Sequence, residues 1–110
     1  LENFKSVNLP EHWHADISIQ STVTNAQKDE DGRLKRLWDT SAGGICSVPV
    51  GSDETARMAA KIYRYIKDFG QSVKIRDLTG EYPGCDLSQL VHLTYILNLY
   101  DLVSIDGEVS

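Results

Sequence analysis

The side chains best suited to chemistry are three histidines and two cysteines, spread over the 110-residue chain. In the stretch HWH, His12 and His14 stand two residues apart and would share one side of an extended segment. With Cys46, Cys85 or His92 they offer the donor atoms that zinc prefers. No CxxC pair occurs, and the ligands would come from distant segments. We therefore expect no metal site and no cofactor, and we interpret the histidines as surface or interface residues.

No arrangement typical of an enzyme is present. His92 follows Cys85 by seven residues, and no Ser-His-Asp or Cys-His order can be argued from that pair. The stretch SAGG lacks the lysine and the spacing of a phosphate-binding loop. Glu81 and Asp86 stand at predicted loops and caps, where solubility and capping explain them. We expect no catalytic activity and no small-molecule substrate.

Length and composition predict one ordinary globular domain, with 41% hydrophobic and 25% charged residues. No apolar run approaches the roughly 20 residues that span a bilayer. There is no signal-peptide pattern, and two cysteines are too few for a disulfide framework. We expect an intracellular location, nucleus or cytoplasm, and we interpret the chain, which begins with Leu1, as a segment of a longer protein. The net charge of −5 disfavours bulk attraction to a polyanion.

The clearest helix signal lies in SDETARMAAKIYRYIKDFG. Ser52 is a favourable N-cap, and Gly70 suits a left-handed C-cap, which together predict a helix near 53–69. The residues expected to face the core are Ala59, Ile62, Ile66 and Phe69, with Tyr63 at their edge.

The remainder of the C-terminal half predicts short elements in regular order. QSVKI suits a short strand, and the spacing that follows predicts a second helix near 75–82. Asp86, with Gln89 three residues later, is a capping-box signal for a third helix near 87–101. LVSI then predicts a strand, and the following Asp-Gly pair predicts a hairpin turn.

The N-terminal half, residues 1–51, is weakly patterned, and we expect an irregular arm that packs on a domain formed by 52–110. Ile17 and Ile19 alternate with polar residues and predict a short strand. NAQKDEDGRLKR is interpreted as a charged loop. One or two turns of amphipathic helix are predicted in RLKRLWDT, where the apolar residues are Leu34, Leu37 and Trp38.

Over residues 52–110, the order helix, strand, helix, turn, helix, strand, Asp-Gly turn resembles the winged helix-turn-helix superfamily. The residues that carry the resemblance are Ile62, Ile66, Phe69, Ile75, Leu78, Leu90, Leu93, Leu97, Val103 and Ile105. It implies an α+β fold, winged-helix-like, with three helices and a short β-hairpin. It also implies a module that binds DNA or other proteins, since fold alone does not choose between them. A full wing needs one more strand, so either the wing is a stub or HADISIQSTV supplies that strand.

The third predicted helix is apolar on two sides. One side would face the core and consists of Leu90, Leu93, Ile96, Leu97 and Tyr100. The other side is our candidate partner-binding surface and consists of Leu87, Val91, Tyr95 and Leu99. Since a small domain has one core, this second side must be covered either by the N-terminal arm, through Trp38 and Trp13, or by a partner.

No lysine or arginine occurs between Asp86 and Asp101, so the third helix is poorly suited to DNA. The basic candidates for a nucleic-acid surface are instead Arg57, Lys61, Arg64, Lys67, Lys74 and Arg76. The sequence thus predicts a protein-protein interaction module whose partner is another protein or a second copy of itself. DNA binding through the basic stripe of the first helix is the alternative, and no membrane association is expected.

Overall fold

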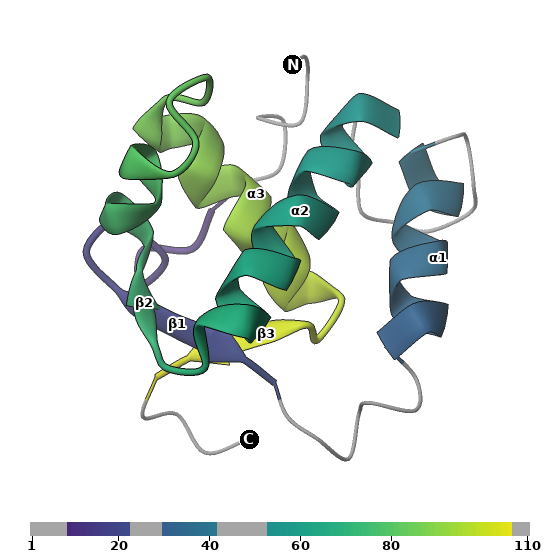
Figure 1. Cartoon of the computed structure of the whole chain (residues 1–110), viewed down its shortest axis with the longest axis horizontal. Coiled ribbons are helices and arrows are strands. Elements are labelled where there is room, and N and C mark those ends of the chain that lie inside the picture. The colour runs from purple at the N-terminus through teal and green to yellow at the C-terminus, as the bar shows by residue number, and fades with distance from the viewer. Residues whose placement is uncertain (1–8, 23–29, 42–52, 107–110) are drawn as a thin grey trace.

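Helices gather on one side of a small antiparallel sheet in the computed structural model, which describes residues 9–22, 30–41 and 53–106 (Figure 1). The fold is therefore α+β, as the sequence predicts. Part of the expected N-terminal arm and the Gly of the expected Asp-Gly turn lie outside the described residues.

The sheet has its N-terminal strand in the centre. β1 (Ser18–Ser21) pairs antiparallel with β2 (Val73–Lys74) on one side and with β3 (Val103–Ile105) on the other. Ile19 is opposite Val73 in one pairing and Ile105 in the other, and its side chain is completely buried. HADISIQSTV thus supplies the central strand of the sheet, which confirms the short strand predicted around Ile17 and Ile19.

Helix α2 (Asp53–Phe69) has the predicted bounds, and Gly70 ends it with a φ of 78°. Ile62 and Ile66 are buried as expected. Phe69 was predicted to face the core, but it is 46% exposed, so that prediction is wrong. As the last residue of the helix, Phe69 packs on the neighbouring ring of Tyr65 instead.

The second predicted helix is a 3₁₀-helix, η3 (Ile75–Gly80), which is typical of so short a segment. Helix α3 (Leu87–Leu99) begins with the expected capping box: the Asp86 carboxylate accepts from the Gln89 backbone N–H, and the Gln89 side chain accepts from that of Asp86. It ends two residues before the prediction, because the chain turns at Asp101, where φ is 59°.

Helix α1 (Glu30–Ser41) is longer than predicted, and the interpretation of 25–36 as a loop is wrong from Glu30 onwards. Gly32 argued against an earlier start, since glycine inside a helix costs about 1 kcal/mol relative to alanine. Burial of Leu34 and Leu37 outweighs this cost, because packing of an apolar face contributes more to helix stability than propensity does. α1 packs beside α2, and its Trp38 lies at the edge of the core.

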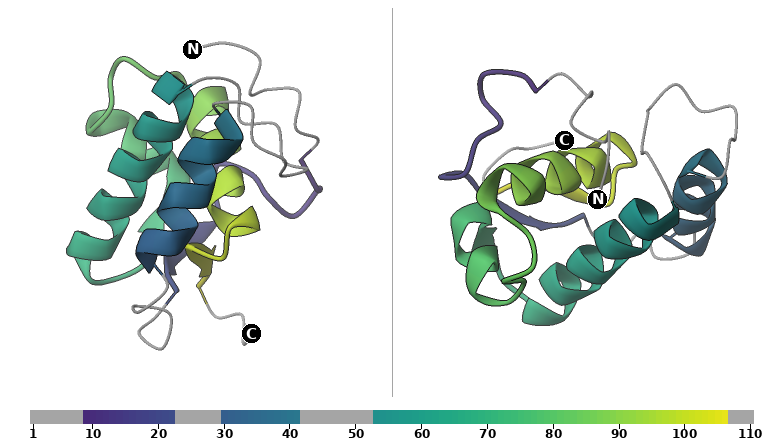
Figure 2. Two further views of the ribbon diagram at one scale, coloured as in Figure 1. Left: turned by 90° about the vertical axis from the view of Figure 1, so that its right-hand side faces the viewer. Right: turned by 90° about the horizontal axis from the view of Figure 1, so that it is seen from above.

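Helix α3 lies between α2 and the N-terminal segment 9–17, as the view from above shows (Figure 2). Both halves of the chain contribute to one hydrophobic core. Its largest completely buried side chains are Ile19, Leu37, Ile62, Ile66, Ile75, Leu78, Leu90, Leu93, Ile96, Leu97 and Leu102. None of the described helices is long and apolar enough to cross a membrane.

Candidate interaction surface

Trp13 covers the middle of the second apolar side of α3. Its side chain is only 3% exposed, and its Nε1 donates to the Val91 carbonyl oxygen at 3.2 Å and to Thr94 Oγ1 at 3.3 Å. Its ring lies 5.5 Å from the ring of Tyr95, centre to centre. Trp13 therefore covers this side of the helix, while Trp38, the other residue expected to cover it, is half-buried on α1.

Backbone pairing holds the Trp13 segment in place. The N–H groups of Ile75 and Arg76 donate to the carbonyl oxygens of Ile17 and Ala15, at 3.1 and 2.9 Å. These bonds continue the pairing of β1 and β2 toward the N-terminus. The Arg76 Nε atom also donates to Asp16 Oδ1 at 2.9 Å, so side chains tie the same segment to η3.

The carboxylate and guanidinium of this pair shift each other's ionisation. The hydrogen bond from Arg76, and then its charge, lower the pKa of Asp16, and the same interactions raise the pKa of Arg76. Both side chains are more than half exposed, so solvent screens the pair and its contribution to stability is small.

Thr94 anchors Trp13 and is the residue that sequence reasoning missed. The sequence alone predicts no role for it, but its side chain is completely buried. Its hydroxyl donates to the carbonyl oxygen of Leu90 or Val91, at 2.8 and 3.0 Å, and accepts from Trp13 Nε1. The available signal was a threonine next to the apolar residues Leu93 and Tyr95, together with a tryptophan whose N–H needs an acceptor when it is buried.

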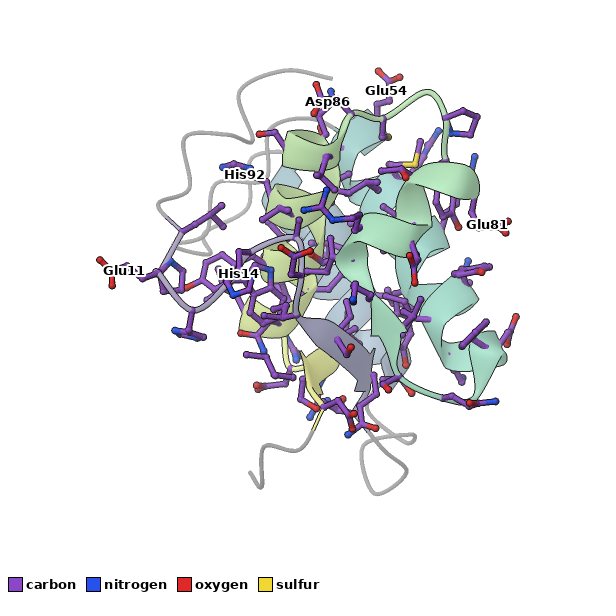
Figure 3. The ribbon with its side chains drawn as sticks, turned by 90° about the vertical axis from the view of Figure 1, so that its left-hand side faces the viewer. Glu11, His14, Glu54, Glu81, Asp86 and His92 are labelled. Atoms are coloured by element: carbon purple, nitrogen blue, oxygen red, sulfur yellow. The ribbon has the colours of Figure 1, made fainter. Side chains whose placement is uncertain are left out.

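An open apolar depression of about 350 Å³ lies between the N-terminal segment and the first turns of α3. It is lined by Leu9, Trp13, His14, Ala15, Leu87, Ser88, Val91 and His92. Figure 3 shows His14 on the N-terminal segment and His92 on α3, on the same side of the molecule. The His14 Nδ1 atom accepts from the Asp16 N–H at 3.2 Å, while His92 Nδ1 donates to the Ser88 carbonyl oxygen at 2.8 Å.

The four predicted partner-binding residues do not form one open surface. Leu87 is half-buried and Val91 is 7% exposed, and both line the depression. Tyr95 is half-buried beside the Trp13 ring. Leu99, at the other end of the helix, is 40% exposed. The structure therefore brings Leu87 and Val91 together and leaves Leu99 apart from them.

The six basic residues predicted for a nucleic-acid surface lie on three different elements, α2, β2 and η3. Arg57, Lys61, Arg64 and Lys67 are exposed on α2, whereas Lys74 lies on β2 and Arg76 is held by Asp16. Within the described part of the chain, no ion pair or hydrogen bond involves the side chains of the first three, whereas Lys67 has a contact of its own. A single continuous basic surface is therefore not formed.

Of the residues considered for chemistry, His14 and His92 line the depression, whereas His12 and Cys85 are not among its lining residues. Across residues 9–22, 30–41 and 53–106, no three His, Cys, Asp or Glu side chains come together as metal ligands would. Cys85 is a buried free thiol. Burial raises its pKa, so a smaller fraction of the thiol is present as the reactive thiolate. Cys46 lies outside the described residues.

Comparison with known proteins gives no match, whether the chain is compared with family models, with curated proteins or with solved structures.

Proposed function

We propose that the chain is a winged-helix-like module that binds proteins within a larger intracellular protein. The order α2, β2, η3, α3, β3 supports the fold part of this proposal. β1 lies between β2 and β3 and takes the place of the strand that would otherwise return from the wing. Fold alone does not assign a function, so the proposal depends on the surfaces.

The observation that carries the proposal is the apolar depression at Leu87 and Val91. Concave apolar sites bind apolar side chains of a partner, because the pocket buries the anchor and excludes water around it. The partner is another protein or a second copy of this chain that inserts such a side chain.

The outer side of α3 supports a protein partner over DNA. A helix that reads bases needs polar side chains directed into the groove and cations around it. From Asp86 to Asp101 the chain has no lysine or arginine, and Trp13 occupies the middle of this side of the helix.

Nucleic-acid binding through α2 is the second candidate, because the exposed cations Arg57, Lys61 and Arg64 form no ion pair in the described part of the chain. Against it, Arg76 is neutralised by Asp16, and Glu54 and Asp68 lie on the same exposed side of α2. Phosphate binding is weakened by nearby carboxylates and falls steeply with salt.

The test is an affinity capture with matched variants. Three chains are immobilised: the wild type, Leu87→Ser and Lys35→Ser. A cell extract is passed over each, and the proteins that stay bound are washed with increasing salt. We expect a specific protein to be retained at high salt by the wild type and by Lys35→Ser, an exposed change on α1, but lost from Leu87→Ser. Submicromolar binding of duplex DNA near physiological salt, abolished by charge reversal at Arg57, Lys61 and Arg64, would support the second candidate instead.

A further inference from the structure

The outward side of α2 carries cations that the fold does not use. α2 lies in front of α3 in Figure 1, and its solvent side is free of the other described helices in the view from above (Figure 2). Arg57, Lys61 and Arg64 are exposed there, and no described residue pairs with their side chains. At 1.5 Å per residue, the three span about 10 Å along the helix.

A row of aromatic rings lies beside these cations. The ring of Tyr65 is 6.0 Å from that of Phe69 and 6.1 Å from that of Tyr82, centre to centre. The Tyr82 hydroxyl donates to the backbone carbonyl oxygen of Lys61 at 3.2 Å, which places this hydroxyl against α2 at one residue of the cationic stripe. Phe69 is 46% exposed although its ring is positioned by Tyr65. The apolar row is therefore formed before any ligand binds.

We propose that this side of α2 docks an acidic segment of a partner protein that also carries an aromatic or large aliphatic side chain. Carboxylates of the segment would pair with Arg57, Lys61 and Arg64, and its apolar side chain would pack on Phe69 and Tyr65. The chain as a whole has a net charge of −5, but within the described residues the stripe of Arg57, Lys61 and Arg64 is unpaired and complements the carboxylates of an acidic ligand. Such complementarity increases the association rate and fixes the orientation of the ligand. This surface is separate from the depression on α3.

The same stripe fits a nucleic acid less well. Glu54 and Asp68 lie on the exposed side of α2, and Glu81 follows η3 directly before Tyr82. Figure 3 shows Glu54 and Glu81 at the outer surface of the molecule. A continuous phosphate backbone, with its evenly spaced charges, would meet these carboxylates as well as the cations, whereas a short acidic segment can place its few carboxylates at the cations alone. The rings of Tyr65 and Tyr82 meet edge to face, at 86°, so they offer no series of parallel ring faces on which successive bases could stack, whereas a single apolar side chain needs only the exposed Phe69 ring and its neighbour.

The first part of the test is a titration of the isotope-labelled chain, followed by NMR, with a synthetic peptide rich in Glu that contains one Phe. We expect chemical-shift changes at α2 and at Tyr82. Replacing the Glu residues of the peptide by Gln, or its Phe by Ala, should weaken binding about tenfold each, the effect of losing about 1.4 kcal/mol. Oligothymidylate is titrated in parallel.

The second part uses variants of the chain. Arg57→Glu with Arg64→Glu, and separately Phe69→Ala, should each weaken peptide binding about tenfold or more, whereas Lys35→Glu, an exposed cation on α1, should leave it unchanged. All these positions are exposed, and an unchanged unfolding transition verifies the fold. The proposal is overturned if α2 shows no shifts, if the Gln peptide binds equally well, or if oligothymidylate binds more tightly through the same residues. The Leu87→Ser capture addresses the other surface, so the two proposals fail separately.

Discussion

Trp13 connects two parts of the chain that are distant in sequence. Its indole donates to Val91 and Thr94, residues 78 and 81 positions away. A buried Trp N–H needs an acceptor, and Trp13 finds two in the Val91 carbonyl oxygen and Thr94 Oγ1, while the Thr94 hydroxyl donates to the backbone of its own helix. This contact covers the middle of the second apolar side of α3 and leaves the depression at Leu87 and Val91 open.

Trp13→Phe and Thr94→Val should therefore be energetically coupled. Each change alone should lower the free energy of unfolding by about 1 to 3 kcal/mol, through lost packing and a lost hydrogen bond. The double variant should lose about 1 kcal/mol less than the sum, because the shared bond is removed only once. Denaturant unfolding of the four proteins measures this. Strict additivity would show that the bond contributes nothing.

At the scale of elements, the N-terminal segment is tied to η3 by the Asp16–Arg76 pair, which gives a pH-dependent prediction. The pKa of Asp16 is lowered from 3.8 in the folded chain, so the unfolded chain binds the proton more readily. The stabilisation from the pair is therefore present above about pH 3.8 and is lost as the pH falls through the folded pKa.

Asp16→Asn should consequently be slightly less stable than the wild type at neutral pH, and the difference should vanish in acid. Arg76→Gln should behave alike, and the double variant should be no less stable than either single change. Thermal unfolding across a pH series measures this. A stability difference that persists unchanged below the folded pKa would contradict the assignment.

How far each element could be predicted depends on whether its determinants are local. α2 and α3 were predictable because caps and apolar spacing lie within the helices: Gly70 ends one, and Asp86 with Gln89 begins the other. The start of α1 was not predictable. Gly32 locally destabilises a helix, and the compensating burial of Leu37 comes from tertiary packing that the local sequence does not reveal. The sequence could not decide whether the N-terminal arm or a partner covers the second side of α3, because the contact of Trp13 with Val91 is also tertiary.

At the scale of the whole molecule, β1 is central to the sheet although it comes first in the chain. Ile19 is completely buried between β2 and β3, and both outer strands pair with β1 alone among the described strands. Removing β1 would expose the backbone groups of both neighbours and part of the core. The C-terminal half therefore depends on the N-terminal half for its fold.

A fragment of residues 52–110 alone should accordingly not fold stably, whereas it should regain structure when residues 9–22 are supplied as a peptide. In the full chain, Ile19→Ala should lower the free energy of unfolding by about 2 to 5 kcal/mol, as large-to-small changes in cores do. Circular dichroism and denaturant unfolding measure both. A cooperatively folded fragment 52–110 would refute the structural role given to β1.

The central claim is that the molecule presents a protein-binding depression on α3, and site-specific photocrosslinking tests it most directly. A photoreactive amino acid is placed at Leu87, in the depression, and at Lys35, exposed on α1, in chains expressed in the cells of origin. We predict a discrete protein adduct, a second copy of the chain included, from position 87 and none from position 35. Adducts with nucleic acid at position 87, or the same protein adducts from both positions, would contradict the claim.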